Sequence, residues 1–158
     1  MSVRPKTDIN AHVLGAAANA QATAAGVAIV LTAGATEDNV EVEGQTINRQ
    51  GFSSCVVMIP FLATLAQDKT LSFGVKYQDS ADGSTWNTAV VMQAATVAAT
   101  GDTGGSNESG IVTLNLLLDP LAQYIRFNIT PDMSATGTDT AVWAAACVLG
   151  GDDTLPAA

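Results

Sequence analysis

The sequence predicts an all-β fold, an antiparallel β-sandwich with an extended N-terminal arm, on three observations. Apolar and polar residues alternate with a period of two in several short runs, most regularly in residues 71–78 and 124–130, as in strands that bury one face. Segments rich in Gly, Asp, Ser and Pro separate the runs and favour turns. About eight such runs occur, which is the strand number of a jelly roll. A seven-stranded immunoglobulin-like sandwich is the alternative.

The first part of the chain, residues 1–25, is predicted to be a flexible arm. It is rich in Ala, Asn, Thr and Gln and has few large apolar side chains, so it cannot bury enough surface to order by itself. Arg4 and Lys6 make it the one locally basic part of an acidic chain. We therefore expect Arg4, Lys6 and His12 to contact a partner.

The β-sandwich domain is expected over residues 26–150, followed by a loose acidic tail over residues 151–158. Residues 53–60 form a nearly continuous apolar run that ends at Pro60, which indicates a strand buried on both sides or an oligomer contact. The Gly-rich residues 98–110 are expected to be a mobile surface loop. The eight predicted strands cover residues 26–33, 38–43, 53–60, 70–78, 87–94, 111–118, 123–130 and 141–149.

Composition and charge argue against several classes of partner. Fifteen acidic residues against six basic ones give a formal charge of −9, which disfavours nucleic acid and anionic membranes. No apolar run reaches the ~18 residues that span a bilayer. Asn10 and His12 interrupt the apolar segment that a secretion signal needs. We therefore expect a protein made in a reducing cell, with Cys55 and Cys147 as buried free thiols.

The residues that carry most enzyme chemistry are scarce. The only histidine, His12, lies in the arm, which argues against a site built on a positioned imidazole, and Cys and His are not clustered as zinc requires. The loop around Asp79 and Asp82 offers oxygen ligands on a Gly-containing turn. It lacks the spacing of an EF-hand, so a hairpin turn is favoured and calcium binding stays open. We expect no enzyme activity, no metal site and no cofactor.

Four segments, in this order, carry a resemblance to a known family. They are GQTINRQGFS at residues 44–53, the apolar strand that follows, QDSADGSTW at residues 78–86 and QYIRFNIT at residues 123–130. Over residues 38–149 the chain resembles the jelly-roll head-decoration, or cement, proteins of tailed bacteriophages, which bind the outside of the capsid shell. The arm lies outside this resemblance.

The resemblance implies a structural virion protein, made in the cytoplasm of the host bacterium. Such a protein binds the outer surface of the capsid and stabilises the head by bridging neighbouring subunits of the major capsid protein. It also implies self-association, as a homotrimer rather than a homodimer. Candidate contacts with the capsid or with other copies are Arg49, Phe52, Val56 and Met58. The alternative is a phage tail or adhesin-type β-sandwich that binds host-surface carbohydrate.

Overall fold

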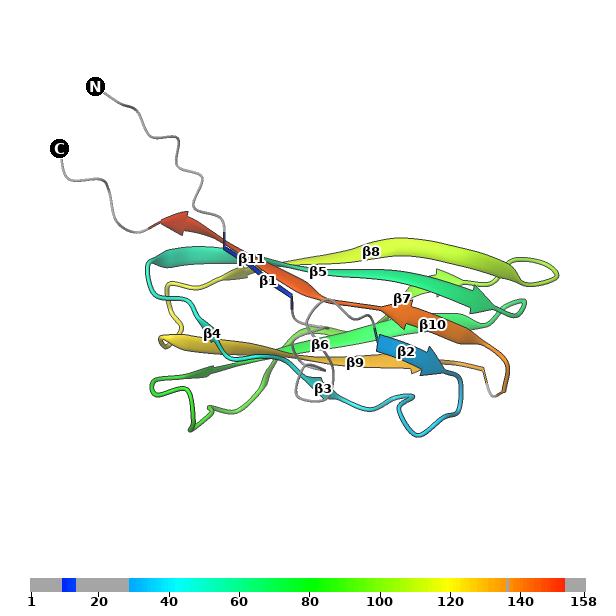
Figure 1. Ribbon diagram of the computed structural model, residues 1–158, viewed down its shortest axis with the longest axis horizontal. Helices are drawn as coiled ribbons and strands as arrows, with labels where there is room; N and C mark the ends of the chain where they lie inside the picture. The colour runs from blue at the N-terminus through cyan, green and yellow to red at the C-terminus, as the bar shows by residue number, and fades with distance from the viewer. Residues whose placement is uncertain (1–9, 14–28, 136, 153–158) are drawn as a thin grey trace, which may run out of the picture.

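The structure, a computed structural model, describes residues 10–13, 29–135 and 137–152, which form two antiparallel β-sheets (Figure 1). Most of the predicted arm, with Arg4 and Lys6, and most of the predicted tail lie outside the described residues. The strands are β1 (Asn10–Val13), β2 (Ile29–Thr32), β3 (Val42–Glu43), β4 (Ile47–Asn48), β5 (Phe52–Leu65), β6 (Thr70–Ser80), β7 (Val90–Thr100), β8 (Ser106–Leu117), β9 (Tyr124–Met133), β10 (Thr140–Trp143) and β11 (Ala146–Asp152).

The first sheet is built around the long strand β5. Along one edge β5 pairs with β8, and along the other it pairs with β11 and then with β10. The free edge of β10 pairs with β2, and that of β11 pairs with β1. Because β1 and β2 lie in line, as do β10 and β11, each pair occupies one strand position. The first sheet therefore has four strand positions.

The second sheet also has four strand positions. Its strand β9 pairs with β6 on one edge and with the short strands β3 and β4 on the other, and β6 pairs with β7. In Figure 1 the strands β8, β5, β11 and β10 form the upper layer, and β9, β6 and β3 lie below them. The two sheets face each other across the core.

The pairing order identifies the sandwich as a jelly roll, as predicted. Across the eight strand positions of the described chain, the first pairs with the eighth, the second with the seventh, the third with the sixth and the fourth with the fifth. This nested order is that of one long hairpin rolled into two sheets. In an immunoglobulin-like sandwich three pairs of consecutive strands are neighbours, whereas among the strands of the described residues only β6 and β7 are both consecutive and paired. The alternative fold is thereby excluded.

Each predicted run overlaps a strand, but the expectation that the third strand ends at Pro60 is wrong. β5 continues to Leu65. The backbone N and O of a strand residue point to the same side, and the carbonyl oxygen of Pro60 accepts from the amide of Ala144. The missing N–H of Pro60 therefore faces the interruption between β10 and β11, where the ladder is already broken, and no ladder bond is lost there.

The mobile loop expected over residues 98–110 is also wrong at both ends. β7 runs to Thr100, and β8 begins at Ser106, where it pairs with Leu65 of β5. One of the four glycines that suggested a loop, Gly110, has a packing reason, because a Cβ at this position would lie 2.8 Å from the ring of Phe61. At the tail, β11 continues to Asp152, two residues beyond the expected domain end.

The core lies between the sheets, and an aromatic cluster stands within it. Phe73 of β6 packs edge-on against Trp143 of β10, with ring centroids 5.7 Å apart, and against Phe61 of β5 at 5.9 Å. Such pairs add specific geometry to the burial of large apolar rings. Around the cluster the fully buried side chains are mostly Leu, Ile and Val. The interior therefore follows the alternation that predicted the inward faces.

The two cysteines are both free and buried, as expected. Cys55 of β5 and Cys147 of β11 lie on neighbouring strands, one diagonal step apart in the register. The hydrogen bond between the two thiols, together with burial, raises the pKa of Cys147 above its ordinary value. A protonated, buried thiol is a poor nucleophile. The pair belongs to the core of the first sheet.

Candidate interaction surface

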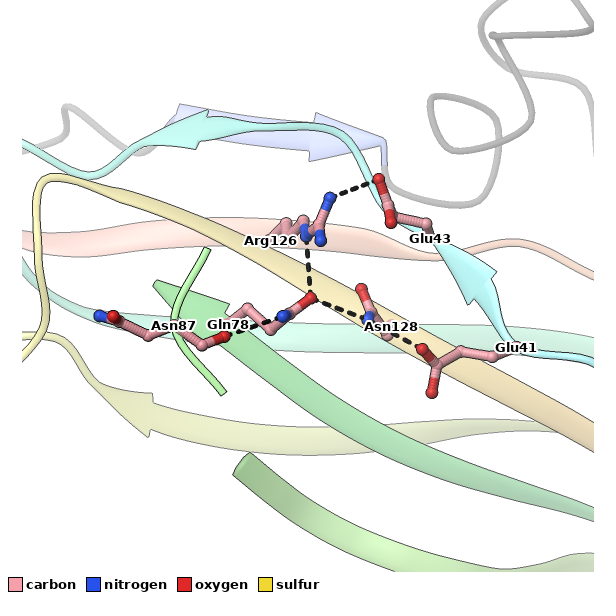
Figure 2. A network of polar contacts seen from close by, with 6 residues as sticks. All are labelled: Glu41, Glu43, Gln78, Asn87, Arg126 and Asn128. Atoms are coloured by element: carbon pink, nitrogen blue, oxygen red, sulfur yellow. Dashed lines mark hydrogen bonds and ion pairs between the residues drawn. The ribbon is translucent and has the colours of Figure 1, made fainter. Parts of the chain in front are cut away.

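The outer face of the second sheet is held together by a network of polar side chains, shown in Figure 2. Arg126 of β9 forms an ion pair with Glu43 of β3, and its Nε donates to Oε1 of Gln78 at 3.0 Å. The same Gln78 oxygen accepts from Nδ2 of Asn128 at 3.2 Å, and Asn128 also donates to Glu41 at 3.0 Å. The network therefore links β9 to β6 and to the segment that leads into β3.

The same network holds the long connection between β6 and β7. Nε2 of Gln78 donates to the carbonyl oxygen of Asn87 at 2.8 Å (Figure 2). The ring of Trp86 lies 4.3 Å from the guanidinium carbon of Arg126, a cation–π contact. Because Arg126 covers one face of this indole, Trp86 acts as part of the fold here.

The connection itself is a self-bonded turn. The carboxylate of Asp82 accepts from the backbone amides of Ser84 and Thr85 at 2.8 and 2.7 Å, and these bonds hold its pKa below the usual range. Asp79 accepts from the amide of Ala122 at 2.8 Å, which lowers its pKa as well. Asp82 therefore serves the hairpin turn that the sequence favoured, and Asp79 holds the end of β6 against the connection between β8 and β9. The described residues contain no group of three or more His, Cys, Asp or Glu placed to hold a metal ion.

The outer face of the first sheet is different in kind, because from Ser54 to Thr64 of β5, and at the positions paired with this stretch in the described part of the chain, no outward residue is charged. We call the following set the uncharged face: Val30 and Thr32 of β2, Ser54, Val56, Met58, Pro60, Leu62 and Thr64 of β5, Asn107, Ser109, Ile111, Thr113, Asn115 and Leu117 of β8, Thr140 and Val142 of β10, and Ala146, Val148 and Gly150 of β11.

The register places the exposed apolar residues of the uncharged face side by side. Val142 lies opposite Val30 on one neighbouring strand and opposite Leu62 on the other. In the next row, Pro60 lies opposite Ile111. Val30 and Ile111 are each 64% exposed and Leu62 is 57% exposed. Directly opposite residues on one face are close enough to contact, so these side chains form a continuous apolar band across the sheet.

The contact residues predicted from the sequence divide between two environments. Val56 and Met58 lie on the uncharged face and are half-buried, whereas the intervening Val57 is a fully buried core residue. Phe52 begins β5 and packs against the core. The backbone of His12 lies in β1, paired with Cys147. Whether any of these residues contacts a partner remains a prediction.

Arg49 is engaged within its own chain. Its guanidinium donates to the backbone carbonyl oxygens of Leu121, of Ala122 at 3.1 Å and of Phe52 at 3.4 Å. Arg49 therefore fixes the turn between β8 and β9 against the start of β5. These three bonds account for the arginine in the GQTINRQGFS segment on structural grounds.

The sequence carries a pattern that indicates the uncharged face, and this pattern predicted some of its residues. Strands of the second sheet such as β9 alternate cleanly, but strands of the first sheet carry apolar residues in both phases, as in Phe61-Leu62 and Leu116-Leu117. The same signal led to Val56 and Met58. The band of Val30, Leu62 and Val142 was missed, because its members come together only through the strand register.

Comparison with known proteins shows the fold class. No protein-family model matches the chain, and no curated protein matches it. Among solved structures, the chain is similar to the infectious bursal disease virus Gt strain structure, with a TM-score of 0.50 and 13% identity over 94% of this chain and 37% of that chain. The VP2 protein of the same virus in T=1 particles gives a TM-score of 0.48 and 14% identity over 96% of this chain and 36% of that chain.

The chain thus spans little more than a third of the length of these structures. At this level of identity the likeness concerns the fold alone. The molecule is an all-β jelly roll of the type found in viral capsids. Its distinguishing surface is the uncharged face of the first sheet. No helix in the described part of the chain is long and apolar enough to cross a membrane.

Proposed function

We propose that this chain is a structural virion protein that binds the outer surface of a phage capsid and stabilises the head by bridging neighbouring capsid subunits. The observation that carries the proposal is the uncharged face, whose exposed apolar band is not covered by the described part of the chain and indicates a protein that works in an assembly, in contact with the capsid or with other copies. Contiguous exposed apolar patches on soluble proteins mark contact sites. Covering such a surface is favourable in water by roughly 25 cal/mol per Å² of apolar area.

Two further features support a role in assembly. The first is the fold, a jelly roll of viral capsid type, together with the resemblance of residues 38–149 to head-decoration proteins. The second is that the charged side chains on the outer face of the second sheet have partners within the chain, as Arg126 has in Glu43. A protein with a preformed polar network on one face and an exposed apolar band on the other is suited to contact, and this task needs no catalytic step.

The proposal assigns the remaining contacts to the arm. Arg4 and Lys6 of the arm would reach a neighbouring capsid subunit, and His12, whose backbone lies in β1, would contact a partner at the edge of the first sheet. Isolated charge pairs contribute only about 0–1 kcal/mol each. Bridging therefore depends on many copies, each of which covers a joint between subunits. The protein is made in the cytoplasm of the host bacterium and works on the outer capsid surface.

The test is reconstitution on particles that lack this protein. Added protein should bind in a copy number near the number of capsid joints, and it should raise the temperature at which the heads release DNA. A copy number of a few per particle, located at the tail, would instead favour the carbohydrate-binding alternative. Failure to bind intact, undecorated heads at tens of micromolar would contradict the proposal.

A further inference from the structure

We propose that the uncharged face is where two copies of this chain pack against each other, sheet to sheet, about a two-fold axis. The inference rests on the proposed function in one respect, namely that the chain acts by assembly. It adds the identity of the surface and of its occupant, a second copy. Three observations carry it, concerning charge, area and the distribution of polar residues.

Charge comes first, because two copies of a chain with formal charge −9 repel each other. The uncharged face is where they can meet without bringing carboxylates together. Glu41 and Glu43 flank the outer face of the second sheet, on the far side of each copy. In a face-to-face pair four sheets are stacked at ~10 Å spacing, so those carboxylates are about 30 Å apart. The Debye length at physiological salt is ~8 Å, so their repulsion is screened.

The area is that of a stable interface. The twelve residue pairs between β5 and β8, at ~3.3 Å per residue, give a length of about 40 Å. Four strand positions at ~4.8 Å give a width of about 19 Å. The product is about 760 Å², close to the ~800 Å² that each partner buries in a standard protein interface. One sheet face therefore suffices.

The composition of the face also matches an interface. The band of Val30, Leu62, Val142 and Ile111 crosses the face from the edge strand β2 to the edge strand β8, and uncharged polar residues such as Thr64 border it at one end. Depletion of charged residues is the compositional signal of an interface core. A single flat patch that meets its own copy makes a closed, two-fold contact. Two such sheets pack at about −30°, as in a sandwich.

The two-fold contact predicts a homodimer. A ring of three would require two different patches on each copy, and the uncharged face is a single patch. The geometry thus favours the dimer over the trimer that the resemblance implied. The capsid would then be contacted by other parts of the chain.

The experiment compares Leu62→Glu with Val91→Glu by light scattering and sedimentation on the full chain. Leu62 is 57% exposed in the apolar band of the uncharged face, and Val91 is 58% exposed on β7 of the other sheet. Both variants gain the same charge at the same exposure. The wild type and Val91→Glu should have twice the chain mass at tens of micromolar. Leu62→Glu should dissociate at least about 100-fold more easily, since the pair would bury two unpaired carboxylates.

A wild-type monomer, a trimer, or a Leu62→Glu variant that dimerises like the wild type would each overturn the inference. If Leu62→Glu does not fold, Ile111→Glu on β8 tests the same face. Binding to undecorated heads separates this inference from the proposed function. If the protein is a monomer that still binds heads, the dimer inference is wrong and the proposed function stands. If Leu62→Glu also abolishes that binding, the uncharged face contacts the capsid and not a second copy. If the protein is a dimer that does not bind heads, the proposed function is wrong and the dimer inference stands.

Discussion

The two outer faces of the sandwich differ in how their side chains are satisfied, although each face is a sheet with four strand positions. On the second sheet, β9 and β6 place Arg126, Gln78 and Asn128 so that each side chain bonds its neighbours. On the first sheet, β5 and β8 present Leu62 and Ile111 to solvent with no charge nearby on the face. Polar side chains can therefore complete a fold by bonding to one another, whereas a contiguous patch of exposed apolar side chains marks a contact site.

The sharpest way to separate fold from contact lies within β5, in two consecutive residues. Phe61 points into the core, 8% exposed, and Leu62 points out. Phe61→Ala should lower the free energy of unfolding by about 3–5 kcal/mol, as loss of a buried ring does. Leu62→Glu should change it by less than about 1 kcal/mol in dilute protein, where copies are apart. Urea denaturation measures both. Equal losses in the two variants would mean that the uncharged face is part of the fold.

The polar network provides the next test, because it should contribute to the stability of the fold and have no effect on self-association. Arg126→Ala removes the ion pair with Glu43, the bond to Gln78 and the contact with Trp86. We expect a loss of about 1–3 kcal/mol with an unchanged mass in solution. Arg126→Lys should recover only part of it, because an ammonium lacks the planar fork. An Arg126 variant with an unchanged free energy of unfolding but without self-association would show that the second sheet, and not the uncharged face, makes the contact.

The turn beside the network predicts a dependence of stability on pH. The pKa values of Asp79 and Asp82 are lowered in the folded chain by hydrogen bonds. A lowered folded-state pKa contributes stability above the unfolded-state pKa of about 3.9, and the contribution is lost as the pH falls through the folded-state pKa. The melting temperature should therefore fall below about pH 4. Asp82→Asn keeps an acceptor oxygen and should flatten this fall. An unchanged pH profile would show that the turn does not couple to folding.

The smallest effect should come from the exposed ion pair between Lys76 and Glu41, 2.8 Å apart. Its partners are well solvated, so Lys76→Met should cost no more than about 0–1 kcal/mol. Salt at 1 M should remove most of that difference, since the Debye length is then ~3 Å. Denaturation in low and high salt measures it. A salt-independent loss above this range would mean that Lys76 acts through packing of its aliphatic stem.

The sequence predicted most of the fold because alternation is a local property. Tyr124–Thr130 alternates apolar and polar residues, and β9 buries Ile125, Phe127 and Ile129 accordingly. Ile47 was harder, because it lies in a polar connection yet is fully buried in β4, opposite Ile125. Nearby, a Cβ at Gly44 would lie 2.4 Å from the carbonyl oxygen of Phe127. Both features depend on a strand that is distant in the sequence.

The candidate surface was less predictable for the same reason. The apolar run in β5 indicated a contact and led to Val56 and Met58. The band that includes Val30 and Val142 is set by pairing among β2, β10 and β5. No local pattern specifies that register, because several of these strands are apolar in both phases. The interruption between β10 and β11 likewise depends on the partner strand β5, because Pro60 has no N–H to donate at that point.

If the uncharged face is covered when the protein works, a cryo-electron microscopy map of decorated heads should show it. We expect density for this chain on the outer capsid surface, in two-fold pairs with Leu62 and Ile111 buried between copies and the Arg126 network outside that contact. Copies whose first sheet faces open solvent on the particle would show that the face is not covered.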